Sequence, residues 1–164
     1  MSNGVQSFLS LGAMMIFSLI SLRFDTAVLQ NTEVEVENKV YLTAFSLADD
    51  LLEEIKQRAF DEKTVDFKAI TTSALTPSAN LGKDSGEEWP NFNDIDDYND
   101  YTKPVSLPHA EKYTVISKIN YVLESDQDQI SSDPTYFKRV TIFVESPYLK
   151  HQIKLSYIFT LHSK

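Results

Sequence analysis

The feature that most limits what this chain can fold into is a stretch of 22 residues at its start without a single charged side chain. Arg23 is the first charged residue, and residues 8–22 read FLSLGAMMIFSLISL. As a helix, the run from residue 4 to residue 22 would be about 28 Å long, close to the roughly 30 Å hydrocarbon core of a bilayer. The sequence therefore predicts an apolar helix of the membrane type over residues 1–24.

A cleavable signal peptide is the alternative for this segment, because its apolar core is also short. Such a peptide carries a basic region before the core and a small-x-small cleavage site after it. Here the residues before the core are MSNG, and no Ala-x-Ala follows. Both features favour a helix that stays on the protein.

An amphipathic helix is expected to continue the first one over residues 25–62. The first proline is Pro77, so no proline ring interrupts this stretch. The weakest point is EVEVE at 33–37, which alternates like a strand, and the helix is expected to end near Phe60. Apolar residues at helical spacing form the predicted buried face: Tyr41, Phe45, Ala48, Leu52, Ile55 and Ala59, widened by Ala44, Leu47 and Leu51.

Residues 63–112 are predicted to be a variable, Asp-rich loop region. They hold four of the six Pro, two of the four Gly, four of the eight Asn and six of the thirteen Asp of the chain, which favours loop. A loop of this length is uncommon in a compact domain unless it is functional. We expect four apolar side chains to fix it to the domain: Trp89, Phe92, Ile95 and Tyr98.

Residues 113–164 alternate apolar and polar side chains in three runs, typical of strands. The three runs extend from Tyr113 to Leu123, from Val140 to Val144 and from Ile153 to Leu161. The short polar connections between them predict an antiparallel meander. The only amphipathic element available to cover one face of that sheet is the 25–62 helix. The predicted fold class is therefore α+β, with residues 25–164 forming one globular domain.

Charge and cysteine content exclude several functions. Lys and Arg number 15 against 24 Asp and Glu, which gives a net charge of −9, so a nucleic-acid partner is not expected. The chain has no cysteine, which excludes disulfides and thiolate metal sites.

Three strings resemble known proteins: LADDLLEEIKQRAFDE at 47–62, FNDIDDYNDY at 92–101 and FKRVTIFVESPYLKHQIKLSYIF at 137–159. Together with the order of helix, loop and meander, they resemble the type IV pilin and pseudopilin superfamily, in particular minor pilin-like proteins of mannose-sensitive haemagglutinin-type pili. The resemblance implies a structural subunit, major or minor, of a filament and no enzymatic activity. It also implies a bacterial inner-membrane anchor through one helix, followed by a place in the periplasm or in a filament at the cell surface.

In that family the apolar helix carries the assembly chemistry, so the resemblance implies that subunits pack through it against copies of themselves or related subunits. Before assembly the same helix would lie in the membrane. The residues implied in assembly are Phe8, Leu9, Leu11, Gly12, Ala13, Met14, Met15, Ile16, Phe17, Leu19 and Ile20.

The N-terminus departs from the family pattern. Family precursors are cut after a Gly and before a Phe, with Glu at the fifth mature position. Gly4 and Val5 are the corresponding processing pair here, but Val5 replaces the Phe and Leu9 replaces the Glu. These departures leave a second hypothesis open: a single-pass anchored, extracytoplasmic binding domain that does not polymerise, with the Asp-rich loop and residues 124–134 contacting a ligand.

Calcium is the one cofactor that the sequence suggests. The Asp-rich loop supplies carboxylates at Asp94, Asp96, Asp97 and Asp100, and calcium takes six to eight oxygen ligands in flexible geometry. The spacing lacks the glycine and the final Glu of an EF-hand. The alternative is that these aspartates cap turns by accepting backbone N–H groups.

No residue cluster indicates catalysis. His109, His151 and His162 show no metal-site or nucleophile spacing. Neighbouring carboxylates such as Glu53 and Glu54 point about 100° apart on a helix. A secreted enzyme is therefore the least supported hypothesis.

Overall fold

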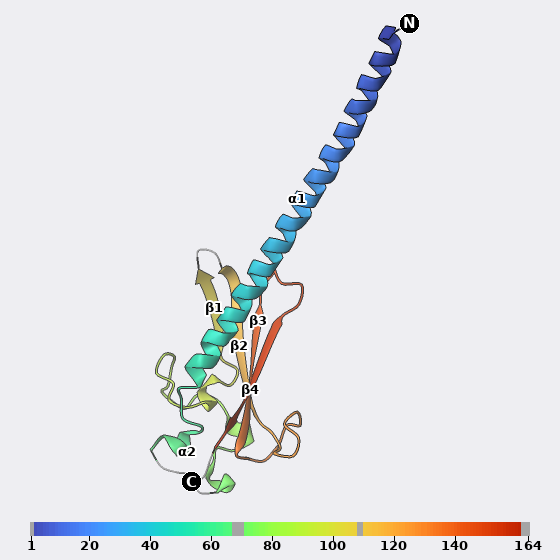
Figure 1. Ribbon diagram of the computed structural model, residues 1–164. Coiled ribbons are helices and arrows are strands. Elements are labelled where there is room, and N and C mark those ends of the chain that lie inside the picture. Colours follow the sequence, from blue (N-terminus) through green and yellow to red (C-terminus); the bar gives the residue numbers. More distant parts are fainter. Residues whose placement is uncertain (1, 67–70, 108–109, 162–164) are drawn as a thin grey trace. The chain divides into compact units, whose positions relative to one another are not determined.

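The computed structural model describes residues 2–66, 71–107 and 110–161 (Figure 1). Two compact units divide the chain, residues 1–39 and residues 40–164. Helix α1 (Ser2–Ile55) begins in the first unit and ends in the second. The second unit adds helix α2 (Glu62–Val65), three single turns η1 (Thr72–Ala74), η2 (Ser78–Asn80) and η3 (Asp96–Tyr98), and strands β1 (Thr102–Leu107), β2 (Ala110–Tyr121), β3 (Phe137–Glu145) and β4 (Ile153–Thr160).

The four strands form one antiparallel sheet in the order β1-β2-β3-β4. Val115 of β2 pairs with Val144 of β3, and Ile142 of β3 pairs with Leu155 of β4. The side chains of Val140, Ile142 and Val144 are fully buried on one face, as their alternation predicts. The meander and the α+β fold class are confirmed.

Strand β1 corrects the prediction that residues 63–112 are all loop. It pairs with β2 from Thr102 opposite Ile116 to Leu107 opposite Ala110. The sequence pattern did not predict this strand because Pro104 lies in a mostly polar stretch, and proline is uncommon in strands. Proline is tolerated there because β1 is an edge strand, and an edge strand has one row of backbone groups that no neighbour needs.

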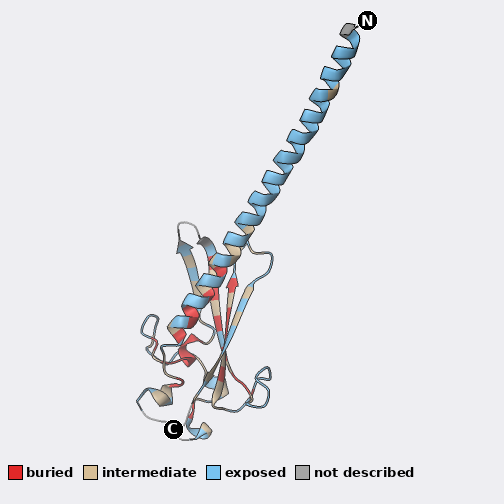
Figure 2. Cartoon of the chain, viewed as in Figure 1, coloured by how far each residue is buried: buried red, intermediate tan, exposed pale blue. Residues whose placement is uncertain are grey.

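The second half of α1 packs on the sheet through a narrower stripe than the one expected. Figure 2 shows buried residues on this part of the helix and on the sheet. Helical spacing predicts that Phe45 lies on the buried face, but its side chain is half exposed. The buried positions advance by four, three and four residues along one face, with Leu52 beside them: Ala44, Ala48, Leu51 and Ile55.

The helix ends at Ile55 rather than near Phe60. The reason is a competing backbone pairing at Ala59, whose N–H donates to Asn93 O at 3.2 Å while its carbonyl accepts the Ile95 N–H at 2.9 Å. These bonds hold residue 59 in an extended bridge with the Asp-rich loop. A helix cannot form those bonds and its own at the same residue.

Helix α1 runs without a break through EVEVE, where Lys39 and Glu35 form an i, i+4 ion pair of 2.7 Å. The predicted anchoring of the Asp-rich loop is confirmed for three side chains: Phe92, Ile95 and Tyr98 are buried. Trp89 is not, with 44% of its surface exposed.

Candidate functional site

The apolar half of α1 has no core of its own. Its large side chains are exposed on all sides of the helix, from 55% for Ile20 to 79% for Phe8, and Figure 2 shows this part as exposed almost throughout. The helix is long and apolar enough to cross a membrane, by length and composition. An exposed apolar surface of this extent needs lipid or protein around it. All eleven residues implied in assembly lie on this part of α1.

The implied processing positions also lie within the described helix. Val5 has 62% of its surface exposed, and apart from the neighbouring backbone of the helix nothing lies within 4 Å of the place where a side chain on Gly4 would begin. Leu9, at the position where the family carries a Glu, is 69% exposed.

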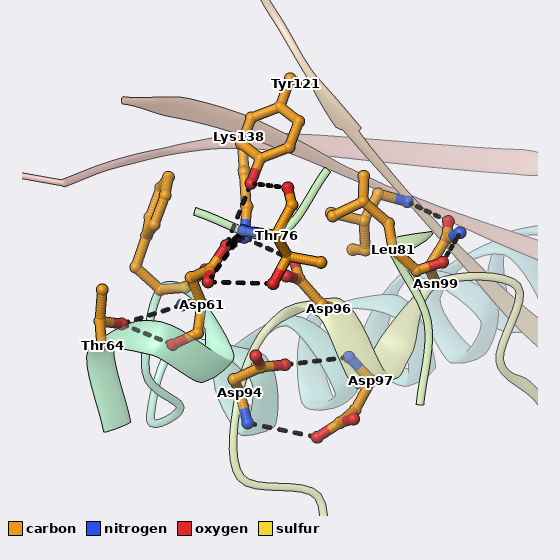
Figure 3. Close-up of polar contacts among 12 residues, drawn as sticks. Asp61, Thr64, Thr76, Leu81, Asp94, Asp96, Asp97, Asn99, Tyr121 and Lys138 are labelled. Atoms are coloured by element: carbon orange, nitrogen blue, oxygen red, sulfur yellow. Dashed lines mark hydrogen bonds and ion pairs between the residues drawn. The ribbon is translucent and has the colours of Figure 1, made fainter. Parts of the chain in front are cut away.

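In the second unit, the structure brings three of the four loop aspartates together beneath the sheet (Figure 3). Asp94, Asp96 and Asp97 are buried, whereas Asp100 is exposed and approaches Lys118 only at 3.9 Å. Asp94 Oδ1 accepts the Asp97 N–H at 3.1 Å, and Asp97 Oδ2 accepts the Asp94 N–H at 3.3 Å. This reciprocal pair is the turn-capping alternative that the sequence left open.

Asp96, the third buried aspartate of the loop, faces the buried ammonium of Lys138. Lys138 of β3 is fully buried, and its ammonium donates three hydrogen bonds: to Asp96 Oδ1 at 2.6 Å, to Asp61 Oδ2 at 2.8 Å and to Phe60 O at 2.8 Å. All three protons of the ammonium therefore have an acceptor. The rings of Phe60 and Tyr121 lie 4.6 and 5.0 Å from the nitrogen and exclude water from it.

Asp61 is the second centre of this cluster. Its carboxylate accepts the Lys63 N–H at 3.0 Å, which caps the short helix α2, and the Thr76 N–H at 3.0 Å. Tyr121 Oη donates to the same carboxylate at 3.0 Å, and Thr76 Oγ1 donates to it at 3.1 Å. One carboxylate thus ties α2, the segment at 76 and two strands together.

The carboxyl groups of the cluster titrate very differently. Burial raises the pKa of Asp61, but the Lys138 ammonium and hydrogen bonds outweigh burial and leave this pKa below its usual value. Burial raises the pKa of Asp96 to about 7 despite Lys138, which is 2.6 Å away. Burial and the nearby charges of Asp96 and Asp97 raise the pKa of Asp94 to about 8.

The role that this cluster can perform is structural. It joins the exit of α1, the Asp-rich loop and the sheet through a charge that is fully paired, and losing one partner would leave a buried charge uncompensated. Lys138 was missed as a candidate residue. Its signal was present in the sequence, because position 138 is in phase with the buried row 140, 142 and 144 of β3.

Calcium at Asp94, Asp96, Asp97 and Asp100 stays a prediction. Within the residues that the structure describes, no group of three or more acidic or histidine side chains is arranged to hold a metal ion. Three of the four aspartates have the protein partners given above. His151 is exposed, while His109 and His162 fall outside the described residues.

Comparison with known proteins identifies no relative: no family model, no curated protein and no solved structure matches this chain.

Proposed function

We propose that this chain is a structural subunit of a type IV pilus-like or pseudopilus filament, which assembles through the apolar half of α1. The observation that carries the proposal is one helix with two kinds of surface. Residues 4–22 expose large apolar side chains, whereas Ala44 to Ile55 supply one layer of the core of a sheet domain. The resemblance of three sequence strings to pilin-like proteins supports the same assignment.

The physical basis of assembly is that the apolar helix exchanges one apolar environment for another. Before assembly, lipid would surround the apolar side chains of residues 4–22, and after assembly the helices of neighbouring subunits would. Both surroundings are apolar, so association depends on close packing rather than on the hydrophobic effect. Small residues in this stretch allow such packing: Ser10, Gly12, Ala13 and Ser18. The partners are therefore copies of this chain or related subunits, and no reaction is involved.

Two positions support the second candidate, a membrane-anchored binding domain that does not polymerise. Leu9 and Val5 replace the residues that the pilin family uses in assembly. A buried Glu in a filament core needs a charged partner, so its absence removes one family interaction. In the Asp-rich loop that this candidate would use for a ligand, Asp100 is exposed, whereas Asp94, Asp96 and Asp97 are buried.

Fractionation of native cells separates the two candidates. Surface filaments would be sheared off, imaged by negative-stain microscopy and analysed by mass spectrometry for this chain and its N-terminus. The filament proposal expects the chain in the filament fraction. Recovery solely as a monomer in membranes would contradict it and support the anchored domain.

A further inference from the structure

A second feature of the 40–164 unit is a cavity of about 400 Å³ beside the Asp-rich loop. Its wall combines aromatic rings with charged side chains, among them Trp89, Phe92, Tyr101, Lys83, Glu88 and Asp100. The volume lies in the range of small-molecule sites, and a mixed apolar and polar lining is typical of them. None of these residues belongs to the Lys138 cluster or to the apolar helix.

Trp89 gives the cavity a fixed and accessible aromatic wall. It is 44% exposed, yet its indole N–H donates to Glu54 Oε1 at 2.8 Å. Lys103 Nζ lies 4.6 Å from the centre of the ring. The orientation of the ring is therefore set before any ligand arrives.

Two further lining residues, Phe92 and Tyr101, belong to a cluster of aromatic rings. Phe92 contacts Tyr98 and Tyr101 edge to face, with ring centres 5.0 and 5.5 Å apart. Tyr98 and Tyr101 meet in the same way at 5.8 Å. Such pairs contribute about 0.5–1.5 kcal/mol beyond their buried area, so they stabilise the positions of Phe92 and Tyr101 in the lining.

Two polar residues of the lining have structural roles already. Asp97 Oδ2 accepts the Asn93 N–H at 3.0 Å, and Asn99 bonds Leu81 O and the Ile119 N–H, both at 3.0 Å. These bonds fix the loop that forms the rim.

Four exposed polar side chains of the lining remain for a ligand: Lys83, Glu88, Asp100 and Thr102. Asp100 has a backbone φ of 57°, in the left-handed region, which Asp adopts more readily than most residues other than glycine.

We propose that this cavity binds a saccharide, with one pyranose ring stacked on Trp89 and its hydroxyls bonded by Glu88, Asp100 and Lys83. The C–H face of a sugar ring carries partial positive charge and meets the negative face of the indole. Hydroxyls both donate and accept, which suits a rim that offers carboxylates, an ammonium and a hydroxyl. A strongly charged ligand is disfavoured because the rim carries both signs.

This proposal goes beyond the proposed filament function and does not depend on it. A filament subunit and an anchored monomer would carry the same cavity. The binding experiment uses purified protein, so its result does not change with the outcome of the fractionation experiment.

Trp89 is the only tryptophan of the chain, so tryptophan emission, excited at a wavelength that the 8 Tyr do not absorb, reports on the cavity. The full-length protein would be held in a detergent without a sugar head group and titrated with methyl pyranosides of hexoses and N-acetylhexosamines. We expect a saturable change in emission with at least one of them, and saturation-transfer NMR signals from that sugar's ring protons.

Variants locate the binding. Trp89→Ala should abolish saturation transfer, whereas Tyr148→Ala should leave it unchanged, since Tyr148 is 56% exposed and does not line the cavity. Glu88→Gln should weaken binding about tenfold, the effect of losing a hydrogen bond to a charged group. Melting curves of each variant would establish that it is folded. No saturable response to any of the sugars, or equal responses from Trp89→Ala and Tyr148→Ala, would overturn the proposal.

Discussion

Lys138 joins segments of the chain that are distant in the sequence. Its ammonium bonds Asp61 and Asp96, which lie 77 and 42 residues away. A buried ion pair is weak evidence of stability in itself, because desolvation opposes the Coulomb attraction. Its effect becomes large when one partner is removed, since the remaining charges then have neither water nor a counter-ion.

Lys138→Met is therefore expected to lower the free energy of unfolding by about 3–5 kcal/mol. The matched control is Lys118→Met on β2, whose side chain is 56% exposed and whose nearest carboxylate oxygen is 3.9 Å away. The control should change stability by no more than about 0.5 kcal/mol. Chemical denaturation measures both, and equal stability of the two variants would contradict the role of the cluster.

The raised pKa of Asp94 predicts how the stability of the folded protein depends on pH. Its ordinary pKa is 3.8 and its pKa in the folded protein is about 8, raised by burial and by Asp96 and Asp97. Between these values the folded state holds a proton that the unfolded state has released. Stability from Asp94 is thus full below its unfolded pKa and is lost as the pH rises through 8. Asp61, with its lowered pKa, acts in the opposite direction only below about pH 4.

We expect the melting temperature to fall by about 5 °C or more between pH 5 and pH 9, and Asp94→Asn to reduce that fall. The substitution removes the titrating group while keeping the shape of the side chain. Asp133→Asn, at an exposed position, is the control and should leave the pH profile as it is. A profile of Asp94→Asn identical to that of the unmodified protein would show that Asp94 does not cause the dependence.

At the scale of elements, α1 has two surfaces with different requirements. From Ala44 to Ile55 one narrow face is buried against the sheet, and the other faces carry charge. From residue 4 to residue 22 no face is charged, and the large side chains are exposed on every side. The first surface is completed by the fold of the chain, and the second requires lipid or other helices.

Leu11→Asp or Ile16→Asp should therefore release the protein from membranes. An Asp near the centre of a spanning helix costs about 2.5–3.5 kcal/mol, and this helix is of marginal length. Gln30→Asp is the control on the same helix, because residue 30 lies beyond the first charged residue, Arg23. The measurement is the fraction of protein that resists alkaline extraction from membranes. Unchanged fractionation of Leu11→Asp would contradict the membrane assignment.

At the scale of the whole molecule, the two compact units predict separable folding. The core residues on α1 begin at Ala44, and Tyr113 Oη reaches back to Val40 O at 3.3 Å. The sheet, the Lys138 cluster and the sugar-binding cavity all lie in residues 40–164.

A chain of residues 40–164 alone should fold and unfold cooperatively, with a melting temperature within a few degrees of the full-length value. Removing residues 1–39 deletes no residue of the core. Circular dichroism and dispersed amide NMR signals would measure this. A fragment that stays unfolded would show that the first unit contributes to the stability of the second.

The local sequence pattern was enough to predict those elements whose structure depends on the periodicity of one segment. The uncharged run up to Leu22 predicted the exposed apolar helix, and alternation at Val140, Ile142 and Val144 predicted β3. Both follow from the periodicity of side chains along one segment. Strand β1 could not be predicted in this way because Pro104 interrupts its pattern, although it pairs with the neighbouring β2. The early end of α1 could not be predicted because it depends on backbone bonds from Ala59 to the distant residues Asn93 and Ile95.

The candidate sites divide in the same manner. The sequence by itself determined an apolar helix that needs apolar surroundings, since absence of charge is a property of one segment. It also marked Asp94, Asp96 and Asp97 as a cluster, but not what they do. Only the tertiary structure decided that Asp96 and Asp61 share the buried Lys138 ammonium, and that Trp89 lines a cavity instead of the core. Burial of a charge depends on partners far away in the chain, and spacing along one segment does not encode which partners meet.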